Sequence, residues 1–223
     1  MPLTIAIDGP VGAGKSTVAD EVAKRLGILH LDTGAMYRAV GLCAQRSGVD
    51  PKNEAEVCAL FENGKNLVDV RYENGRQITM LGREDVSGLI RTQEVGMAAS
   101  NVSTLKKVRA MLVRRQQELA AQQPMLLDGR DIGTVVLPNA TLKVYLTASS
   151  EARARRRMLQ LQEKGETADF DTILRQVNER DDQDMHREND PLRQAEDAVL
   201  VDSSDMTFEE TVETILKLTE ERV

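Results

Sequence analysis

A glycine-rich segment near the N-terminus carries the residues with the clearest chemistry. It reads Gly9-Pro10-Val11-Gly12-Ala13-Gly14-Lys15-Ser16-Thr17 and fits the pattern G-x-x-x-x-G-K-[ST] at every required position. Glycines let backbone N–H groups approach a phosphate closely, the lysine reaches the β and γ oxygens, and the serine hydroxyl binds Mg²⁺. The segment follows an expected strand and precedes an expected helix, which is the context this motif requires. It predicts that residues 9–17 bind a nucleoside triphosphate and that Lys15 is catalytic.

Asp128 is a second candidate ligand for magnesium, together with Ser16. It ends the apolar run 125–127, where a Walker-B-like carboxylate would assist the metal. Asp128-Gly129 is equally a common turn dipeptide, so a purely structural role is the alternative.

The charged residues favour small phosphorylated ligands over nucleic acid. The formal net charge is −7, which argues against a nucleic-acid polymer as a partner. The basic residues are mostly arginine and concentrate in the second half of the chain. Arginine grips phosphate oxygens with two parallel hydrogen bonds, although surface ion pairs would give the same composition.

Short apolar segments alternate with helical patterns along the chain. The five expected strands are Leu3–Ile7, Ile28–Leu31, Met125–Leu127, Leu142–Leu146 and Ala198–Val201. Gly27 is a candidate C-cap of the first helix, and Thr207 with Glu210 predicts a capping box at the start of the last. Continuous apolar strands alternating with helices predict an α/β fold whose parallel sheet is covered on both faces.

One region breaks this alternation. Residues 68–72 and 77–81 have strand character, and Asn74-Gly75 between them favours a type I′ turn. A local hairpin cannot belong to a parallel sheet made of crossover units. We therefore expect a small antiparallel insert at about residues 63–92.

Four further clusters, read together behind the glycine-rich loop, carry a specific resemblance. They are Asp32-Thr33-Gly34-Ala35-Met36-Tyr37-Arg38, Arg91-Thr92-Gln93-Glu94-Val95, Asp128-Gly129-Arg130-Asp131-Ile132-Gly133-Thr134 and Glu179-Arg180-Asp181-Asp182-Gln183-Asp184-Met185-His186-Arg187. In this order the chain resembles the bacterial cytidylate kinases over essentially its whole length. The resemblance implies a three-layer P-loop nucleoside monophosphate kinase fold with a central parallel sheet, a small antiparallel β insert and a short lid.

The resemblance also implies an organisation and an activity. One kinase domain would span residues 1–223, with a core at about 1–38, 110–152 and 188–223. A monophosphate-binding region would occupy about 39–109, and a lid about 153–187. The activity implied is phosphate transfer from ATP, with Mg²⁺, to CMP or dCMP.

Carried over by motif, ten residues are expected to bind the acceptor: Thr33, Tyr37, Arg38, Ser100, Arg109, Arg130, Asp131, Arg180, Asp184 and Arg187. Arg130 and Arg187 join Lys15 as expected catalytic residues. Thr33 stands where many relatives have serine, and the hydroxyl is retained. Arg180 and Asp184 are expected to hold the sugar hydroxyls by this likeness alone.

The roles expected of the lid arginines, and of the carboxylate that would contact the base, also have a chemical basis. Arg153 and Arg157 share a helix face, and in related kinases lid arginines close over the phosphates of ATP, so we expect both to be catalytic. A solvated basic face is the alternative. Cytosine presents an exocyclic amino group, for which the carboxylate of Asp131 is a natural acceptor, helped by Ser100 and Arg109. Asp131 could instead pair with Arg130 or cap a turn.

Three other functions remain open at this point. The chain could phosphorylate UMP, AMP or shikimate, act as a GTP-driven switch, or bind nucleotide without catalysis. An N-K-x-D segment for reading guanine does not occur in the sequence, which disfavours the switch. We expect a cytoplasmic protein without membrane contact, for three reasons. The two cysteines have no metal-ligand spacing, the first segment reads as a strand, and no apolar run is long enough to cross a membrane. We expect a monomer.

Overall fold

The computed structural model describes residues 2–62, 64, 67–163, 165–167 and 169–222. The chain forms two compact units. Unit 1 comprises Met1–Pro2 and Leu29–Met125, and unit 2 comprises Leu3–Ile28 and Leu126–Val223. Residue 63, where the expected insert begins, and residues 164 and 168 of the expected lid lie outside the described residues.

Unit 2 is built on parallel strands in the order β6-β1-β7-β8. Ile5 of β1 pairs with Leu142 of β7, and Val144 of β7 pairs with Val199 of β8. Ile5, Ile7, Leu142 and Leu146 are almost fully buried, as expected for strands covered on both faces. The bounds are β1 (Thr4–Asp8), β6 (Met125–Gly129), β7 (Leu142–Thr147) and β8 (Val199–Asp202). These four predicted strands are confirmed within a residue or two at each end.

Two helices of unit 2 pack against this sheet and against each other, α1 (Lys15–Leu26) and α8 (Phe208–Glu220). Val18 and Val22 of α1 and Val212 and Ile215 of α8 join the strands in one apolar core. Both predicted caps are present. Gly27 ends α1 at a φ of 65°, and Thr207 and Glu210 form the capping box of α8.

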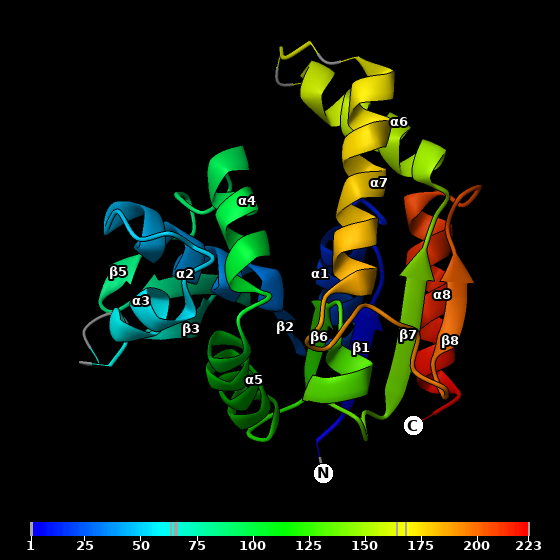
Figure 1. Ribbon diagram of the computed structural model, residues 1–223. Coiled ribbons are helices and arrows are strands. Elements are labelled where there is room, and N and C mark those ends of the chain that lie inside the picture. The colour runs from blue at the N-terminus through cyan, green and yellow to red at the C-terminus, as the bar shows by residue number, and fades with distance from the viewer. Residues whose placement is uncertain (1, 63, 65–66, 164, 168, 223) are drawn as a thin grey trace. The chain divides into compact units, whose positions relative to one another are not determined.

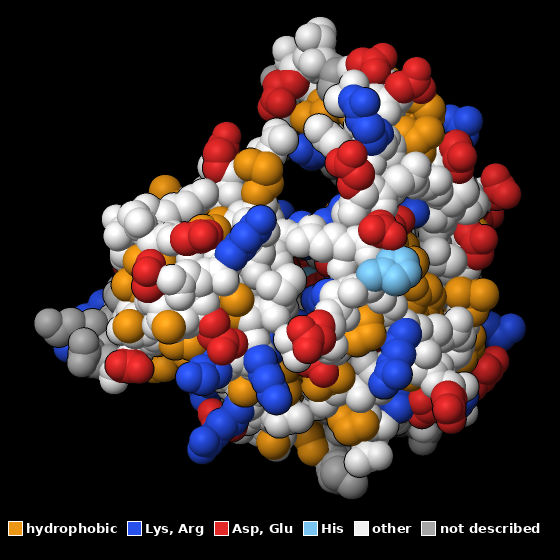
Figure 2. Space-filling model, viewed as in Figure 1, with side chains coloured by type: hydrophobic (Ala, Val, Ile, Leu, Met, Phe, Trp, Pro, Cys, Tyr) orange, Lys and Arg blue, Asp and Glu red, His pale blue; other side chains and the backbone are white. Residues whose placement is uncertain are grey.

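Helices α6 (Ser150–Glu163) and α7 (Phe170–His186) run side by side in unit 2 (Figure 1). Ala154 of α6 packs with Ile173 and Val177 of α7 in a small core of their own. Figure 2 shows side chains of both charge signs on the visible surface of this pair, with apolar side chains between them. The pair therefore has its own apolar support, and its outer face is charged.

Unit 1 contains the fifth predicted strand, β2 (Leu29–Asp32), and the predicted hairpin. In the hairpin, Val68 pairs with Leu81 and Glu73 with Arg76, in antiparallel register. Asn74 and Gly75 have φ values of 52° and 77°, as a type I′ turn requires. A third strand, which the sequence did not predict, extends this small sheet. The sheet order is β3 (Val68–Glu73), β4 (Arg76–Leu81) and β5 (Glu84–Asp85).

The helices of unit 1 are α2 (Thr33–Arg46), α3 (Glu54–Ala59), α4 (Gln93–Val102) and α5 (Lys106–Ala120). Helices α2 and α4 approach unusually closely at Gly41, where a Cβ atom would lie 2.8 Å from the backbone nitrogen of Ala99. This packing brings the facing residues of α2 and α4 close together.

The fold class predicted from the sequence is confirmed. It is α/β, with a parallel sheet and a small antiparallel sheet. Among the described residues, none of the helices combines the length and the hydropathy needed to cross a lipid bilayer.

Candidate active site

The glycine-rich loop lies between β1 and α1 in unit 2, as predicted. At Gly9 the loop passes so close to β7 that a Cβ atom would lie 1.9 Å from the carbonyl oxygen of Leu146. Gly14 precedes α1 with a φ of 86°, and α1 begins without a side-chain cap. The first N–H groups of an uncapped helix, with the positive end of its dipole, form an anion site. The loop therefore has the geometry of a phosphate cradle.

Lys15 is buried within this cradle, and its Nζ donates a hydrogen bond to the carbonyl oxygen of Pro10 at 2.8 Å. Burial, and after it the positive charge of Arg130, lowers the pKa of Lys15 to about 7. The carboxylates of Asp128 and Asp184 oppose this shift. A phosphate group would supply the counter-charge that favours the charged form of this lysine.

Ser16 and Asp128 lie together, as a shared magnesium site requires. The Ser16 hydroxyl donates to Asp128 Oδ2 at 2.9 Å, and Asp128 is 4% exposed. Asp128 lies inside β6 and not in a turn. A hydroxyl and a carboxylate are hard oxygen donors that suit Mg²⁺, so the residues present fit that ion.

Three of the expected acceptor residues form one ion-pair cluster in unit 2. Arg130 Nε donates to Asp184 Oδ2 at 2.8 Å, and Arg180 Nε lies 3.3 Å from Asp184 Oδ1. Burial pushes the pKa of Asp184 upward, but the charges of Arg130 and Arg180 outweigh it and hold that pKa below its ordinary value. Asp184 thus fixes two arginines that the sequence places far apart from each other.

Asp131 and Arg187 form a second pair in the same unit. Both are buried, and Arg187 Nη2 lies 3.6 Å from Asp131 Oδ1. Arg187 Nε also donates to the carbonyl oxygen of Asp190 at 2.7 Å. Asp131 immediately precedes a short π-helical turn, η1 (Ile132–Val136).

The other five expected acceptor residues lie in unit 1. Thr33 and Tyr37 are buried on one face of α2, one turn apart. Arg38, the next residue on α2, donates through Nη1 to the carbonyl oxygen of Ile90 at 3.0 Å.

Ser100 and Arg109 lie close to α2, on α4 and α5. Ser100 is buried on α4, the helix that packs against α2. The Arg109 guanidinium carbon lies 5.7 Å from the centroid of the Tyr37 ring, and Nη1 donates to the carbonyl oxygen of Ser103 at 3.2 Å. The structure therefore brings this group together within unit 1, as it does the other group within unit 2.

The two expected lid arginines differ in their exposure to solvent. Arg157 is exposed on α6, whereas Arg153 is buried near the start of that helix. Arg153 donates to the carbonyl oxygens of Ala148 at 2.8 Å and Val11 at 2.9 Å, and pairs with Asp181 of α7 at 2.6 Å. These three bonds use three of the five N–H groups of Arg153 and hold its side chain between the glycine-rich loop and α7.

Sequence reasoning missed Asp8 and the role of Asp181. Asp8 ends β1 directly before the loop, and both of its carboxylate oxygens accept backbone N–H groups at 2.7 Å, from Ile132 and Gly133. The signal for Asp8 is a carboxylate that closes an otherwise apolar strand. For Asp181 the sequence offers none, because its partner Arg153 is distant along the chain.

Burial raises the pKa of Asp8 from 3.8 to about 6, against the lowering effect of its two backbone hydrogen bonds, and the nearby Asp131 adds to the rise. Because the pKa is higher in the folded state, folding favours the protonated form. The resulting stability is complete below about pH 4 and is lost as the pH rises through about 6. A shift of about two pKa units corresponds to on the order of 3 kcal/mol.

We therefore compare the free energy of unfolding of the wild type with that of Asp8→Asn. The wild-type value minus the variant value is expected to fall by up to about 3 kcal/mol as the pH rises from 4 to 7. Denaturant titrations at several pH values measure this difference, in which the other titrating groups largely cancel. A difference that stays constant across the range would contradict a raised pKa at Asp8.

Comparisons with known proteins give one consistent result. The family model described as cytidylate kinase matches residues 5–221. A protein named cytidylate kinase from Caldicellulosiruptor bescii is 47% identical over 216 residues, which cover 97% of this chain and 95% of that protein. Another of that name, from Mannheimia succiniciproducens, is 44% identical over 223 residues, 99% of this chain and 97% of that protein. A solved structure from Eubacterium ventriosum shares the fold, with a TM-score of 0.54, 12% identity and full coverage of both chains.

Proposed function

This chain belongs to the cytidylate kinase family, and we propose that it transfers the γ-phosphoryl group of ATP to CMP and dCMP, giving ADP with CDP or dCDP. One observation carries the chemical part of this proposal. The phosphate cradle at the start of α1 holds a buried lysine, Lys15, next to the Arg130–Asp184 ion pair. A donor phosphate in the cradle would thus face a second source of positive charge.

The acceptor supplies its own nucleophile. The second pKa of a phosphate monoester is near 6, so the attacking oxygen is largely ionised at neutral pH and needs no protein base. The task of the protein is then to align two polyanions and to neutralise their charge. Lys15 and the N-terminus of α1 hold the donor, and Arg130 and Arg187 hold the acceptor phosphate and the transferring group.

Ser16 and Asp128 would hold Mg²⁺ in this enzyme. The ion, when bound with ATP, neutralises charge on the phosphate oxygens. The hydrogen bond between Ser16 and Asp128 already orients both oxygens toward each other.

Selection of cytosine is assigned to Asp131, with help from Ser100 and Arg109. A carboxylate accepts a hydrogen bond from the exocyclic amino group of cytosine, whereas uracil would present a carbonyl oxygen to it. Two acceptors facing each other without a proton are unfavourable, so UMP is expected to be the poorer substrate. Arg180 and Asp184 are proposed to contact the sugar, and Thr33, Tyr37 and Arg38 to complete the acceptor site.

ADP release measured in parallel with CMP, dCMP, UMP, AMP and shikimate tests this function. We expect rapid, magnesium-dependent release with CMP and dCMP and slow release with the other three. Rapid release with shikimate or AMP alone would assign the chain to another acceptor. Tight binding of GTP over ATP without turnover would instead favour a nucleotide switch.

The two lid arginines give a prediction that separates a contact with phosphate from a structural role. Arg157→Ala should lower kcat by roughly 10- to 100-fold without a change in stability, since Arg157 is exposed and free to close over ATP. Arg153→Ala should instead lower the free energy of unfolding by about 3 to 5 kcal/mol, because it leaves the Asp181 carboxylate without its partner.

Steady-state kinetics and denaturant unfolding of the two variants, side by side, check this. Arg155→Ala, on the same helix and exposed, is the matched control and should change neither quantity. If Arg157→Ala keeps the wild-type kcat, Arg157 does not contact the phosphates.

We further propose that the enzyme is a cytoplasmic monomer. Both Cys43 and Cys58 are free thiols, which suits a reducing compartment. Sedimentation of the purified protein at micromolar concentration measures its mass directly.

A further inference from the structure

Asp8 is a buried carboxylate that the phosphoryl transfer itself does not require. It is 5% exposed at the end of β1, and its two oxygens accept the backbone N–H groups of Ile132 and Gly133, each at 2.7 Å. Hydrogen bonds from N–H groups to a carboxylate at this distance are short and strong. A single side chain therefore fixes two consecutive peptide groups.

Those two peptide groups lie directly after the residues proposed to bind the acceptor. Arg130 and Asp131 are consecutive in the chain, and Ile132 follows Asp131 directly. The Ile132 N–H belongs to the peptide group that joins it to Asp131, so the tether acts on the backbone directly next to these side chains. Any shift of the backbone at Ile132 would move the Asp131 carboxylate, and Arg130 with it.

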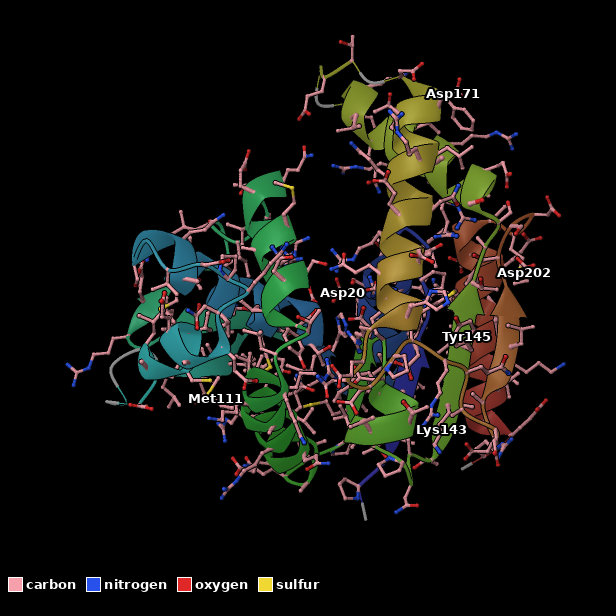
Figure 3. All side chains as sticks on the ribbon, in the orientation of Figure 1. Asp20, Met111, Lys143, Tyr145, Asp171 and Asp202 are labelled. Carbon is pink, nitrogen blue, oxygen red and sulfur yellow. The ribbon has the colours of Figure 1, made fainter. Side chains whose placement is uncertain are left out.

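The first turn of η1 also packs against Lys143. A Cβ atom at Gly133 would lie 3.1 Å from Lys143 Cδ and 3.3 Å from Asp8 Oδ2, so the backbone sits against both side chains. Lys143 is itself buried and is held by Asp197 at 2.8 Å. Figure 3 labels Lys143 on β7, two residues before Tyr145, whose Cα is the register partner of Asp8.

The Asp8 carboxylate lies in surroundings that disfavour its charged form. Burial raises its pKa, and Asp131 lies close enough to raise it further, while Lys15 acts in the opposite direction. At neutral pH the ionised group gives two charge-assisted bonds, which a neutral amide of the same shape cannot give, because one of its ends is a donor.

We propose that Asp8 is a positioning residue for the acceptor, which holds Arg130 and Asp131 in their binding geometry through the backbone of Ile132 and Gly133. This inference rests on the proposed function, because it takes those two side chains to bind CMP. The proposed role of Asp8 differs from that of the glycine-rich loop that directly follows it. Loss of Asp8 is expected to weaken binding of the acceptor, whereas the loop is proposed to bind ATP.

Equilibrium binding to Asp8→Asn tests the proposal, with CMP and with a non-hydrolysable ATP analogue plus Mg²⁺ measured separately by calorimetry. We expect the Kd for CMP to rise by roughly 10- to 100-fold, and the Kd for the analogue to change by less than about threefold. The preference for CMP over UMP in kcat/KM should fall in the same variant, because Asp131 is displaced.

Gly133→Ala provides an independent second variant. It keeps Asp8 and both N–H groups but presses a methyl group against Asp8 and Lys143, so it should weaken CMP binding with the same selectivity. If Asp8→Asn does not fold, Gly133→Ala decides the question. Asp171→Asn, an exposed change of the same kind on α7, is the control and should bind both ligands as the wild type does.

Weakened binding of the ATP analogue, with unchanged binding of CMP, would overturn the proposal and assign Asp8 to the glycine-rich loop. So would unchanged binding of both ligands. If the wild type itself fails to bind CMP, the proposed function is wrong, and this result is distinct from both of the others.

Discussion

Replacing Lys15 with alanine is expected to lower kcat by roughly 100- to 1,000-fold while leaving the protein folded. The charge of Lys15 is proposed to stabilise the transferring phosphoryl group, so its loss affects the transition state more than the ground state. Stability should not fall, because the lysine is buried at a cost that already lowers its pKa. Coupled ADP release at saturating ATP and CMP, with thermal unfolding of the same preparation, measures both quantities.

Lys24→Ala is the matched control for this experiment. Lys24 lies on the same helix, but its side chain is 77% exposed and pairs with Glu21. Its removal should leave kcat unchanged. An Lys15→Ala enzyme that turns over at the wild-type rate would show that the cradle binds nucleotide without catalysing transfer.

The second large effect is expected at Asp131, where replacement by asparagine should lower the ratio of kcat/KM for CMP to that for UMP by about 10- to 100-fold. An asparagine can turn its amide nitrogen toward the carbonyl oxygen of uracil, so the variant should lose activity with CMP and gain relative activity with UMP. The ratio is more informative than either rate alone. The Arg187 guanidinium, 3.6 Å from Asp131, is disturbed equally for both substrates.

Asp182→Asn serves as the control for Asp131→Asn. Its side chain is 77% exposed on α7, and the substitution should leave the CMP-to-UMP ratio as it is in the wild type. An unchanged ratio in Asp131→Asn would refute the assignment of cytosine selection to this carboxylate.

Local signals in the sequence were sufficient for most of the fold. Asn74-Gly75 predicted the hairpin because a type I′ turn needs two positive φ angles, and both are found. Thr207 and Glu210 predicted the start of α8 for a similarly local reason. By contrast, β5 is only two residues long and both are exposed, so it has no apolar pattern from which it could be predicted.

The candidate site was predictable where one short segment carries the chemistry and not where distant segments meet. The glycine-rich loop contains its lysine and serine within eight residues, so the pattern alone was enough. The same role was expected of Arg153 as of Arg157, and only the fold shows that its partners are Val11, Ala148 and Asp181. Asp8 was missed for the same reason, since Ile132 and Gly133 lie far along the chain.

These findings have a common physical theme in unit 2. Charged side chains that bind backbone groups connect the segments of this unit: Asp8 binds the first turn of η1, and Arg153 of α6 binds the glycine-rich loop. Such bonds are stronger than neutral ones and fix geometry as well as energy. The same residues that fold this unit are therefore proposed to align its substrates.

The most direct test of the account follows a labelled phosphate. ATP carrying radioactive phosphorus in its γ position is incubated with the enzyme, magnesium and CMP, and the products are separated by chromatography. We expect the label to appear in CDP, as its terminal phosphate, in the same amount as the ADP formed. Label recovered as inorganic phosphate, or remaining in ATP while CMP is unchanged, would contradict it.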